Sequence, residues 1–267
     1  MKPLSEFPAA ARRATRGVFC DLDDTLTSDG LLTARAYSAL ERLSGAGLPV
    51  VVITGRPAGW CDHIARMWPV AAAVGENGAF YFRYDHGRHE MQRRYLDDAA
   101  TRAAHRARLA AIGEEIVKAV PGAAIAADQL YRETDLAIDY REDVARLPRA
   151  AVDRVVALIE RHGLTAKLSS IHVNGWFGAY DKLTMARALM HEVFGIDLDA
   201  ARAQYVFVGD SPNDAPLFAH FPHAAGVANI HDFDGRLAHA PAYVTQARGG
   251  DGFHEVAECL LAARNPA

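Results

Sequence analysis

The hydrophobic pattern near the start of the chain consists of short apolar runs separated by segments with helical spacing. The runs GVFCDL (17–22), LPVVVITG (48–55) and VAAAVGENGAF (70–80) are rich in strand formers, and helical segments follow the first two. The pattern returns after residue 182, where AQYVFVGDS (203–211) reads as another buried strand. Alternating strands and helices are typical of a parallel sheet covered on both faces, so the sequence predicts an α/β fold.

The middle of the chain has a different pattern. Short alternating segments are followed by a long Ala/Arg/Glu helix at about 98–120, two strand-like segments, a helix at about 147–162 and another strand-like segment. This order is typical of an α+β domain built on an antiparallel sheet. We therefore predict one α/β core domain, residues 1–82 and 179–267, interrupted by an inserted domain, residues 83–178.

Composition and charge narrow the classes of function. The 267 residues are 50% hydrophobic and 23% charged, with a net charge of −4, as in ordinary globular proteins. No Lys/Arg-rich run with interleaved aromatics indicates a nucleic-acid partner. No apolar run approaches the roughly 18 to 20 residues that span a bilayer, and the first residues lack the apolar run of a secretory signal. We expect a cytoplasmic monomer or homodimer with no membrane or nucleic-acid partner, whose pocket can still bind a small anion.

Polar residues gather where four predicted strands end. In open α/β sheets, ligands bind at the edge formed by the carboxyl ends of the strands. These strand ends supply Asp21, Asp23, Asp24 and Thr25; Thr54, Gly55 and Arg56; Gly75, Glu76 and Asn77; and Gly209, Asp210, Ser211, Asn213 and Asp214. Clustered carboxylates are costly unless a cation neutralises them, and an all-oxygen set suits Mg²⁺ far better than zinc. The sequence therefore predicts a magnesium site.

Three of these features, together with Lys182, resemble the ordered motifs of the haloacid dehalogenase (HAD) superfamily. They are Asp21-Leu22-Asp23-Asp24-Thr25, Thr54, Lys182 and Gly209-Asp210-Ser211-Pro212-Asn213-Asp214. The place and size of the insert resemble the α/β cap of the type IIB branch, which includes Cof-like sugar phosphatases. The resemblance extends from about Gly17 to the C-terminus, and it implies a Rossmann-like parallel-sheet core with an inserted α+β cap of type C2B.

The resemblance implies a Mg²⁺-dependent phosphatase that hydrolyses a small phosphorylated metabolite, expected to be a sugar phosphate. Asp21 would be the nucleophile that forms an aspartyl-phosphate, and Asp23 would protonate the leaving alcohol and then deprotonate water. Chloride needs no proton to leave, so Asp23 disfavours dehalogenation. Asp21, the main-chain carbonyl of Asp23 and Asp210 would hold Mg²⁺, with Asp214 as a ligand or a partner of the ligands.

The resemblance also implies which residues would hold the phosphoryl group. Thr54 and the amides that follow it, beginning at Gly55, would donate hydrogen bonds to this group. Lys182 would add positive charge to it and to Asp21, and Asn213 is a neighbour in the same site. The simpler interpretations are that Thr54 caps the next helix and that Lys182 is solvated.

Contacts to the rest of the substrate are expected from the insert, acting as a lid over the site. We predict His172 and Asn174 of the insert as candidates, and Arg56 of the core as either a substrate contact or a helix-start residue. Asp24 is interpreted as a turn residue, and the Glu76-Asn77-Gly78 turn as setting a hairpin rather than facing the substrate.

Two other functions use the same motifs. A phosphomutase of the phosphomannomutase type would need a basic cluster for a second phosphate, for which the insert offers Arg132, Arg141 and Lys167. A non-catalytic binding protein could retain the fold, but it would have no use for a nucleophile beside its own acid. Release of phosphate, as against isomerisation of a hexose phosphate, distinguishes the hydrolase from the mutase.

Overall fold

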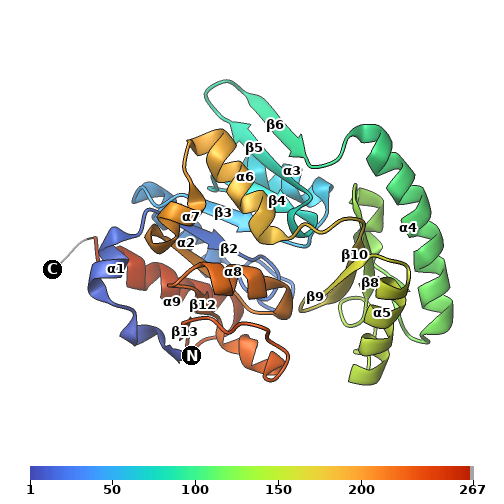
Figure 1. Ribbon diagram of the computed structural model, residues 1–267. Coiled ribbons are helices and arrows are strands. Elements are labelled where there is room, and N and C mark those ends of the chain that lie inside the picture. Colours follow the sequence, from blue (N-terminus) through green and yellow to red (C-terminus); the bar gives the residue numbers. More distant parts are fainter. Residues whose placement is uncertain (265–267) are drawn as a thin grey trace.

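The computed structural model describes residues 1–264 (Figure 1). These residues form two β-sheets, and the larger one has nine strands. Their order across the sheet is β1-β13-β12-β11-β2-β3-β4-β5-β6. The strands are β1 (Lys2–Pro3), β2 (Gly17–Cys20), β3 (Val50–Ile53), β4 (Ala72–Gly75), β5 (Phe80–Asp85), β6 (Glu90–Tyr95), β11 (Tyr205–Gly209), β12 (Ala225–Gly226) and β13 (Tyr243–Val244).

The centre of this sheet is parallel and buried on both faces. Strands β11, β2, β3 and β4 pair in parallel, and every residue in them is buried. One face packs against α2 (Ala34–Gly45), α3 (Ala58–Met67) and α9 (Gly249–Ala262), and the other against α6 (Lys182–Phe194) and α8 (Ala215–His220). Burial on both faces explains the unbroken apolar runs of these strands, and it confirms the predicted α/β core.

Strands β5 and β6 extend the larger sheet beyond the boundary predicted at residue 82. The chain reverses after β4 through Asn77 and Gly78, whose φ angles of 56° and 107° are left-handed. Strand β5 then pairs antiparallel with β4, and β6 pairs antiparallel with β5. The aromatic rings of Phe80 and Phe82 stack at 4.5 Å and join the hydrophobic core of this domain. Residues 83–95, which we expected in the insert, therefore lie on the core sheet.

The second sheet is antiparallel and has its own hydrophobic core. Within residues 1–264 its strands are β7 (Ala124–Ile125), β8 (Asp135–Asp139), β10 (His172–Trp176) and β9 (Thr165–Leu168), in that order across the sheet. Helices α4 (Ala99–Ala119) and α5 (Arg149–Arg161) cover one face. This is the α+β architecture predicted for the insert, and it is called the cap below.

The other face of the cap sheet is turned toward the core. The side chain of Val173 faces the cap helices, and a Cβ added to Gly175 would lie 2.6 Å from Ile159 of α5. Their neighbours on β10 point to the opposite face, because side chains alternate along a strand. From this side of the cap, the Nη1 atom of Arg132 donates a hydrogen bond of 2.8 Å to the backbone oxygen of Gly55 in the core. The uncovered face of the cap thus lies over the ends of the core strands.

The remaining helices are short. They are the α-helices α1 (Ala9–Ala14) and α7 (Leu198–Ala201).

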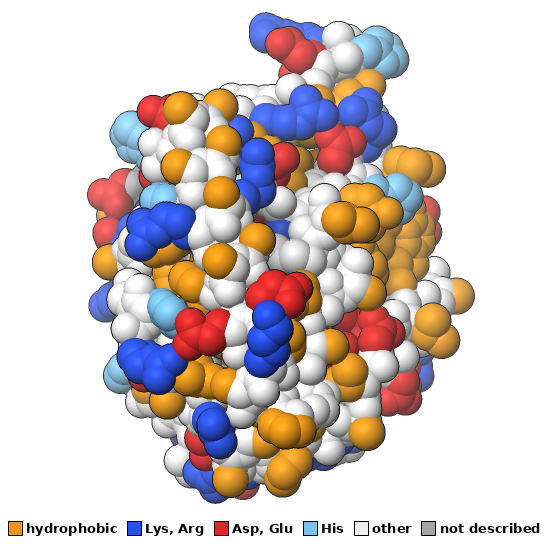
Figure 2. Space-filling view, turned by 90° about the vertical axis from the view of Figure 1, so that its right-hand side faces the viewer, with side chains coloured by type: hydrophobic (Ala, Val, Ile, Leu, Met, Phe, Trp, Pro, Cys, Tyr) orange, Lys and Arg blue, Asp and Glu red, His pale blue; other side chains and the backbone are white. Residues whose placement is uncertain are grey.

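On the face that includes α4, basic and acidic side chains are interspersed (Figure 2), as in the pair between Arg106 and Glu133. Across residues 1–264, a helix with the length and apolar character needed to cross a bilayer is not found.

Candidate active site

The predicted site residues meet at one edge of the core sheet because the strands before them are parallel and adjacent. Strand β2 lies between β11 and β3, with Cys20 in register with Val208 and Val52. The residues that follow these strands, beginning with Asp21 and Asp210, therefore leave the sheet at the same level. Residues that are far apart in the sequence therefore meet at the same edge of the sheet.

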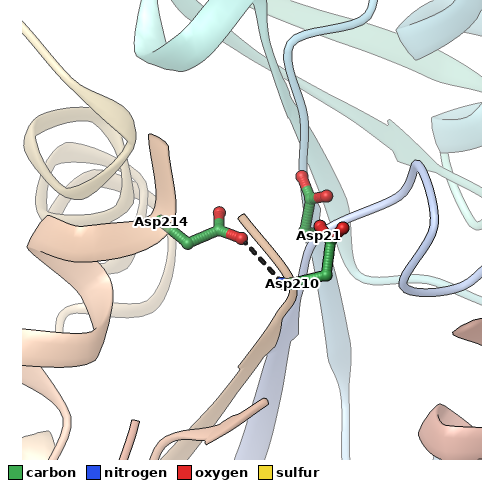
Figure 3. A group of neighbouring side chains, drawn as sticks. All are labelled: Asp21, Asp210 and Asp214. Atoms are coloured by element: carbon green, nitrogen blue, oxygen red, sulfur yellow. Dashed lines mark hydrogen bonds between the residues drawn. The ribbon is translucent and has the colours of Figure 1, made fainter. Parts of the chain in front are cut away.

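Three carboxylates form a buried acidic cluster at this edge. Carboxylate oxygens of Asp21, Asp210 and Asp214 lie within 4.8 Å of one another. Figure 3 shows Asp21 and Asp210 side by side, with Asp214 directed toward them. Burial, and then the charge of Asp21, raise the pKa of Asp210 well above its usual value, and burial likewise raises the pKa of Asp21. This excess of negative charge is what a bound cation would relieve, so the cluster could hold a metal ion.

Lys182 links two members of the acidic cluster. Its side chain is 1% exposed, and its Nζ atom lies 2.6 Å from Asp21 Oδ1 and 2.7 Å from Asp214 Oδ1. Lys182 is the first residue of α6, whose start is fixed by Asp181 accepting a hydrogen bond from the Thr184 amide. Burial alone would lower the pKa of Lys182, but the two carboxylates outweigh it and raise the pKa. The ammonium group is therefore charged. Although it contacts two carboxylates, its single positive charge can balance only one of the three negative charges in the cluster.

The loop after β11 holds the other acidic side chains in place. Asp214 Oδ2 accepts hydrogen bonds from the amides of Asp210 (3.0 Å) and Ser211 (3.3 Å). Asp210 in turn accepts hydrogen bonds from Thr25 Oγ1 (3.3 Å) and Asn229 Nδ2 (3.0 Å). Asp214 is thus bound by the charged Lys182 as well as by two amides, whereas the donors to Asp210 are both neutral side chains. This arrangement favours Asp214 as the residue that orients Lys182.

The predicted phosphate-binding residues lie beside the acidic cluster. The hydroxyl of Thr54 is buried and accepts a hydrogen bond of 2.9 Å from the Arg56 amide. Thr54 does not cap the next helix, because the N-cap residue of α3 is Pro57. Asn213 Nδ2 donates to Asn77 Oδ1 at 3.2 Å, which ties the loop after β11 to the turn after β4. Within residues 1–264, the buried Nδ2 atom of Asn77 has no hydrogen-bond partner, and Asn77 lies against Gly55. The roles of these residues in phosphate binding stay a prediction.

The three candidate substrate contacts are all engaged by carboxylates in this structure. The Nε atom of Arg56 donates to Asp23 Oδ1 at 2.8 Å, and Asn174 Nδ2 donates to Asp135 Oδ2 at 2.8 Å. His172 Nε2 lies 2.9 Å from an oxygen of Glu142. The cap therefore brings these side chains to the core, but substrate would have to displace existing partners to reach them.

Comparisons with known proteins show a family similarity over part of the chain and a shared fold. Residues 18–112 match the family model of haloacid dehalogenase-like hydrolases. This match shows that residues 18–112 are similar to that family. The comparison with curated proteins gives no match.

Solved structures share the fold of this chain. Protein 0175 of Thermoplasma acidophilum aligns with a TM-score of 0.68 at 18% identity, covering 92% of this chain and 98% of that one. The sucrose-phosphatase of Synechocystis, solved with sucrose and phosphate, aligns at 0.60 and 16% identity, with the same coverage. The C-terminal domain of C. albicans trehalose-6-phosphate phosphatase aligns at 0.69 and 14% identity, covering 97% and 98%. At these identities the likeness establishes the fold, with its core and cap.

Some residues at the candidate site were missed by sequence reasoning. Asn229 contacts Asp210 and follows the short strand β12, so the strand-end argument would have found it had that strand been weighed. Asp128 and Glu142 come from the cap and bind Arg56. Glu142 lies three residues after β8, but no pattern in the sequence indicates that this loop reaches the core.

The basic cluster that a phosphomutase would need is not assembled. Arg132 is buried in ion pairs with Asp128 and Asp135. Arg141 instead lines a cavity of about 130 Å³ together with Asp24, Ser170 and Arg248, and Lys167 lies in a separate groove beside Pro212 and Arg236. The three cations of the cap therefore face different places.

Glu76 joins the core to the cap. Its carboxylate accepts hydrogen bonds from the amides of Ala58 (3.0 Å) in the core and of Glu133 (2.9 Å) and Thr134 (2.6 Å) in the cap. Burial, and then the charge of Asp135, raise the pKa of Glu76 against these hydrogen bonds. The turn that contains Glu76 is thus structural, as interpreted from the sequence, and it also fixes the base of the cap.

Replacing Glu76 by glutamine is expected to lower the free energy of unfolding by about 2 kcal/mol, because the new amide group would face backbone donors and leave one of them unpaired. Urea denaturation measures this loss. Glu114→Gln is the control, since Glu114 is exposed on α4 and has no ion pair within residues 1–264. Equal stabilities of the two variants would contradict the prediction.

Proposed function

We propose that this protein is a Mg²⁺-dependent phosphatase that acts on a small phosphorylated metabolite, with sugar phosphates as the substrate class. The observation that carries the proposal is the position of Lys182, held between Asp21 and Asp214 inside a buried acidic cluster. A carboxylate placed beside both a fixed ammonium group and a potential metal site is suited to attack a phosphoryl group. The sugar phosphatases among the proteins of the same fold support the substrate class.

The acidic cluster fits a hard divalent cation. Its ligand atoms are carboxylate oxygens alone, and they are buried and incompletely neutralised. Asp21 and Asp210 would hold the ion, with Asp214 orienting Lys182 beside them. When bound, Mg²⁺ would neutralise phosphoryl oxygens that otherwise repel the attacking carboxylate.

The side chains of the core supply the remaining steps. Asp21 attacks phosphorus, and the bond from phosphorus to the alcohol oxygen breaks as an aspartyl-phosphate forms. Asp23 gives its proton to the leaving oxygen, then takes a proton from the water that attacks the same phosphorus and frees Asp21. Lys182 holds Asp21 in place throughout, and its charge balances the phosphoryl group.

The cap would exclude water and select the alcohol part of the substrate. Its uncovered sheet face lies over Asp23 through the contacts of Arg56 with Asp128 and Glu142. Opening of these ion pairs would give substrate access to Asp23. We infer that opening and closing of the cap accompany each turnover.

Phosphate release from a panel of sugar phosphates and other phosphomonoesters tests this proposal. We expect release with Mg²⁺ and a loss of at least about 100-fold after removal of the metal with EDTA, because the phosphoryl charge is then no longer neutralised. Re-addition of Mg²⁺ to the same sample is the control and should restore release. Isomerisation of a hexose phosphate without release would indicate the mutase, and binding without turnover would indicate a binding protein.

A further inference from the structure

One guanidinium group connects the cap to the predicted acid of the core. Arg56 is 4% exposed, and its Nε atom donates a hydrogen bond of 2.8 Å to Asp23 Oδ1. The other side of the same group faces the cap: Nη1 lies 3.2 Å from Asp128 Oδ2 and 3.2 Å from Glu142 Oε2, and Nη2 pairs with the second oxygen of Glu142. Arg56 therefore binds one carboxylate of the core and two of the cap.

The pair between Arg56 and Glu142 is bidentate and is held from both ends. The guanidinium carbon of Arg56 lies 4.4 Å from the centre of the Trp60 ring, which restricts the plane of the group. Behind Glu142, His172 Nε2 lies 2.9 Å from its carboxylate. Burial would raise the pKa of Glu142, but the nearby His172 and Arg56 outweigh it and lower the pKa to about 2. Glu142 is thus a carboxylate at neutral pH.

We propose that Glu142 of the cap is a positioning residue for Asp23, acting through Arg56. The inference rests on the proposed function, because it takes Asp23 as the acid that protonates the leaving alcohol. Arg56 has a long side chain with many rotamers, and a bidentate partner selects the one that places Nε on Asp23. Since Glu142 lies on the cap and Asp23 on the core, this arrangement is complete only when the cap is closed.

Glu142 is the member of this group that can be changed with the least disturbance. Asp128 also binds the buried Arg132, so its replacement would leave a second buried cation short of a partner. The Glu142 side chain is 26% exposed, and it lies on the loop between β8 and α5. Glutamine keeps its shape and removes only the charge and one acceptor oxygen.

Phenyl phosphate and 4-nitrophenyl phosphate provide the test, because the two esters are similar in shape and lack sugar hydroxyls that Glu142 could bind. Phenolate is the poorer leaving group and depends more on protonation by Asp23. The kcat/KM value reports the steps up to departure of the phenol, so the later attack of water does not enter. We expect Glu142→Gln to lower kcat/KM about 10-fold for phenyl phosphate and less than about 2-fold for 4-nitrophenyl phosphate.

Three further variants make the outcome decisive. Asp23→Asn should give the largest difference between the two esters in the loss of kcat/KM. Lysine cannot bind Glu142 in a bidentate manner, so Arg56→Lys should also lower kcat/KM more for phenyl phosphate than for 4-nitrophenyl phosphate. Asp143→Asn removes a charge from the same loop and should change neither value, since the Asp143 side chain has no ion pair in the described part of the chain.

If Glu142→Gln lowered kcat/KM equally for both esters while Asp23→Asn distinguished them, this inference would be overturned. The proposed phosphatase function would not be affected by that result. The absence of any difference in Asp23→Asn would remove Asp23 as the acid and overturn the inference as well. If the wild-type protein released phosphate from no ester, the proposed function itself would fail. Thermal melting of each variant verifies that it is folded.

Discussion

Replacing Asp21 by asparagine is expected to lower the rate of phosphate release about 1000-fold or more. The amide of asparagine has nearly the shape of the carboxylate but is a poor nucleophile, so no phosphorylated side chain can form. Stability should not fall with activity. Without a metal ion, the variant should be at least as stable as the wild type, because a buried negative charge is removed beside Asp210 while Lys182 keeps Asp214 as its partner.

Phosphate release and urea denaturation, both measured on the same preparations, check the two parts of this prediction. Asp29→Asn is a matched control, because Asp29 lies on the same segment after β2 but outside the acidic cluster. Its activity should stay close to that of the wild type. If Asp21→Asn kept more than about a tenth of the wild-type rate, Asp21 would not be the nucleophile.

Replacing Lys182 by methionine is expected to have the largest effect on stability. Methionine fills the space of the lysine stem but leaves Asp21 and Asp214 buried without their shared cation. Breaking a buried ion pair by removing one partner costs about 3 kcal/mol or more. Phosphate release should also fall by at least about 100-fold, because Asp21 loses the group that orients it and the phosphoryl group loses a positive charge.

The cause of this destabilisation can be separated from a simple packing defect. Adding Asp214→Asn to Lys182→Met should recover part of the lost stability, since the double variant buries one unpaired carboxylate fewer. Arg187→Met is the control on the same helix: its ion pair with Asp199 is exposed, so we expect a loss below about 1 kcal/mol. A Lys182→Met protein as stable as Arg187→Met would contradict the assigned role of the buried pair.

The core of the fold was predictable because its signals are local. A parallel strand buried on both faces needs an unbroken apolar run, and β2, β3 and β11 have one. The strands β5 and β6 were placed in the wrong sheet because alternating polarity shows that one face is buried but not which sheet it joins. That choice was made by the left-handed turn at Asn77 and Gly78 and by the packing of Phe80 against the core.

The acidic cluster was predictable for a related reason. Asp21, Asp210 and Asp214 each follow a recognisable strand, and the parallel order of these strands brings their ends together. Thr54 was a less secure prediction, because a hydroxyl at a strand end serves equally well as a cap. In the structure it accepts a hydrogen bond from the Arg56 amide.

The sequence by itself determined the α/β core, the inserted α+β cap and the edge at which the acidic residues meet, because periodicity and strand order are properties of neighbouring residues. Only the tertiary structure decided that Arg56 would bind Asp23 and Glu142, which lie 33 and 86 positions away along the chain. A charged side chain on a loop carries no periodic signal, and its partner is selected by the distance and burial that folding creates. The connection between cap and predicted acid therefore exists only in three dimensions.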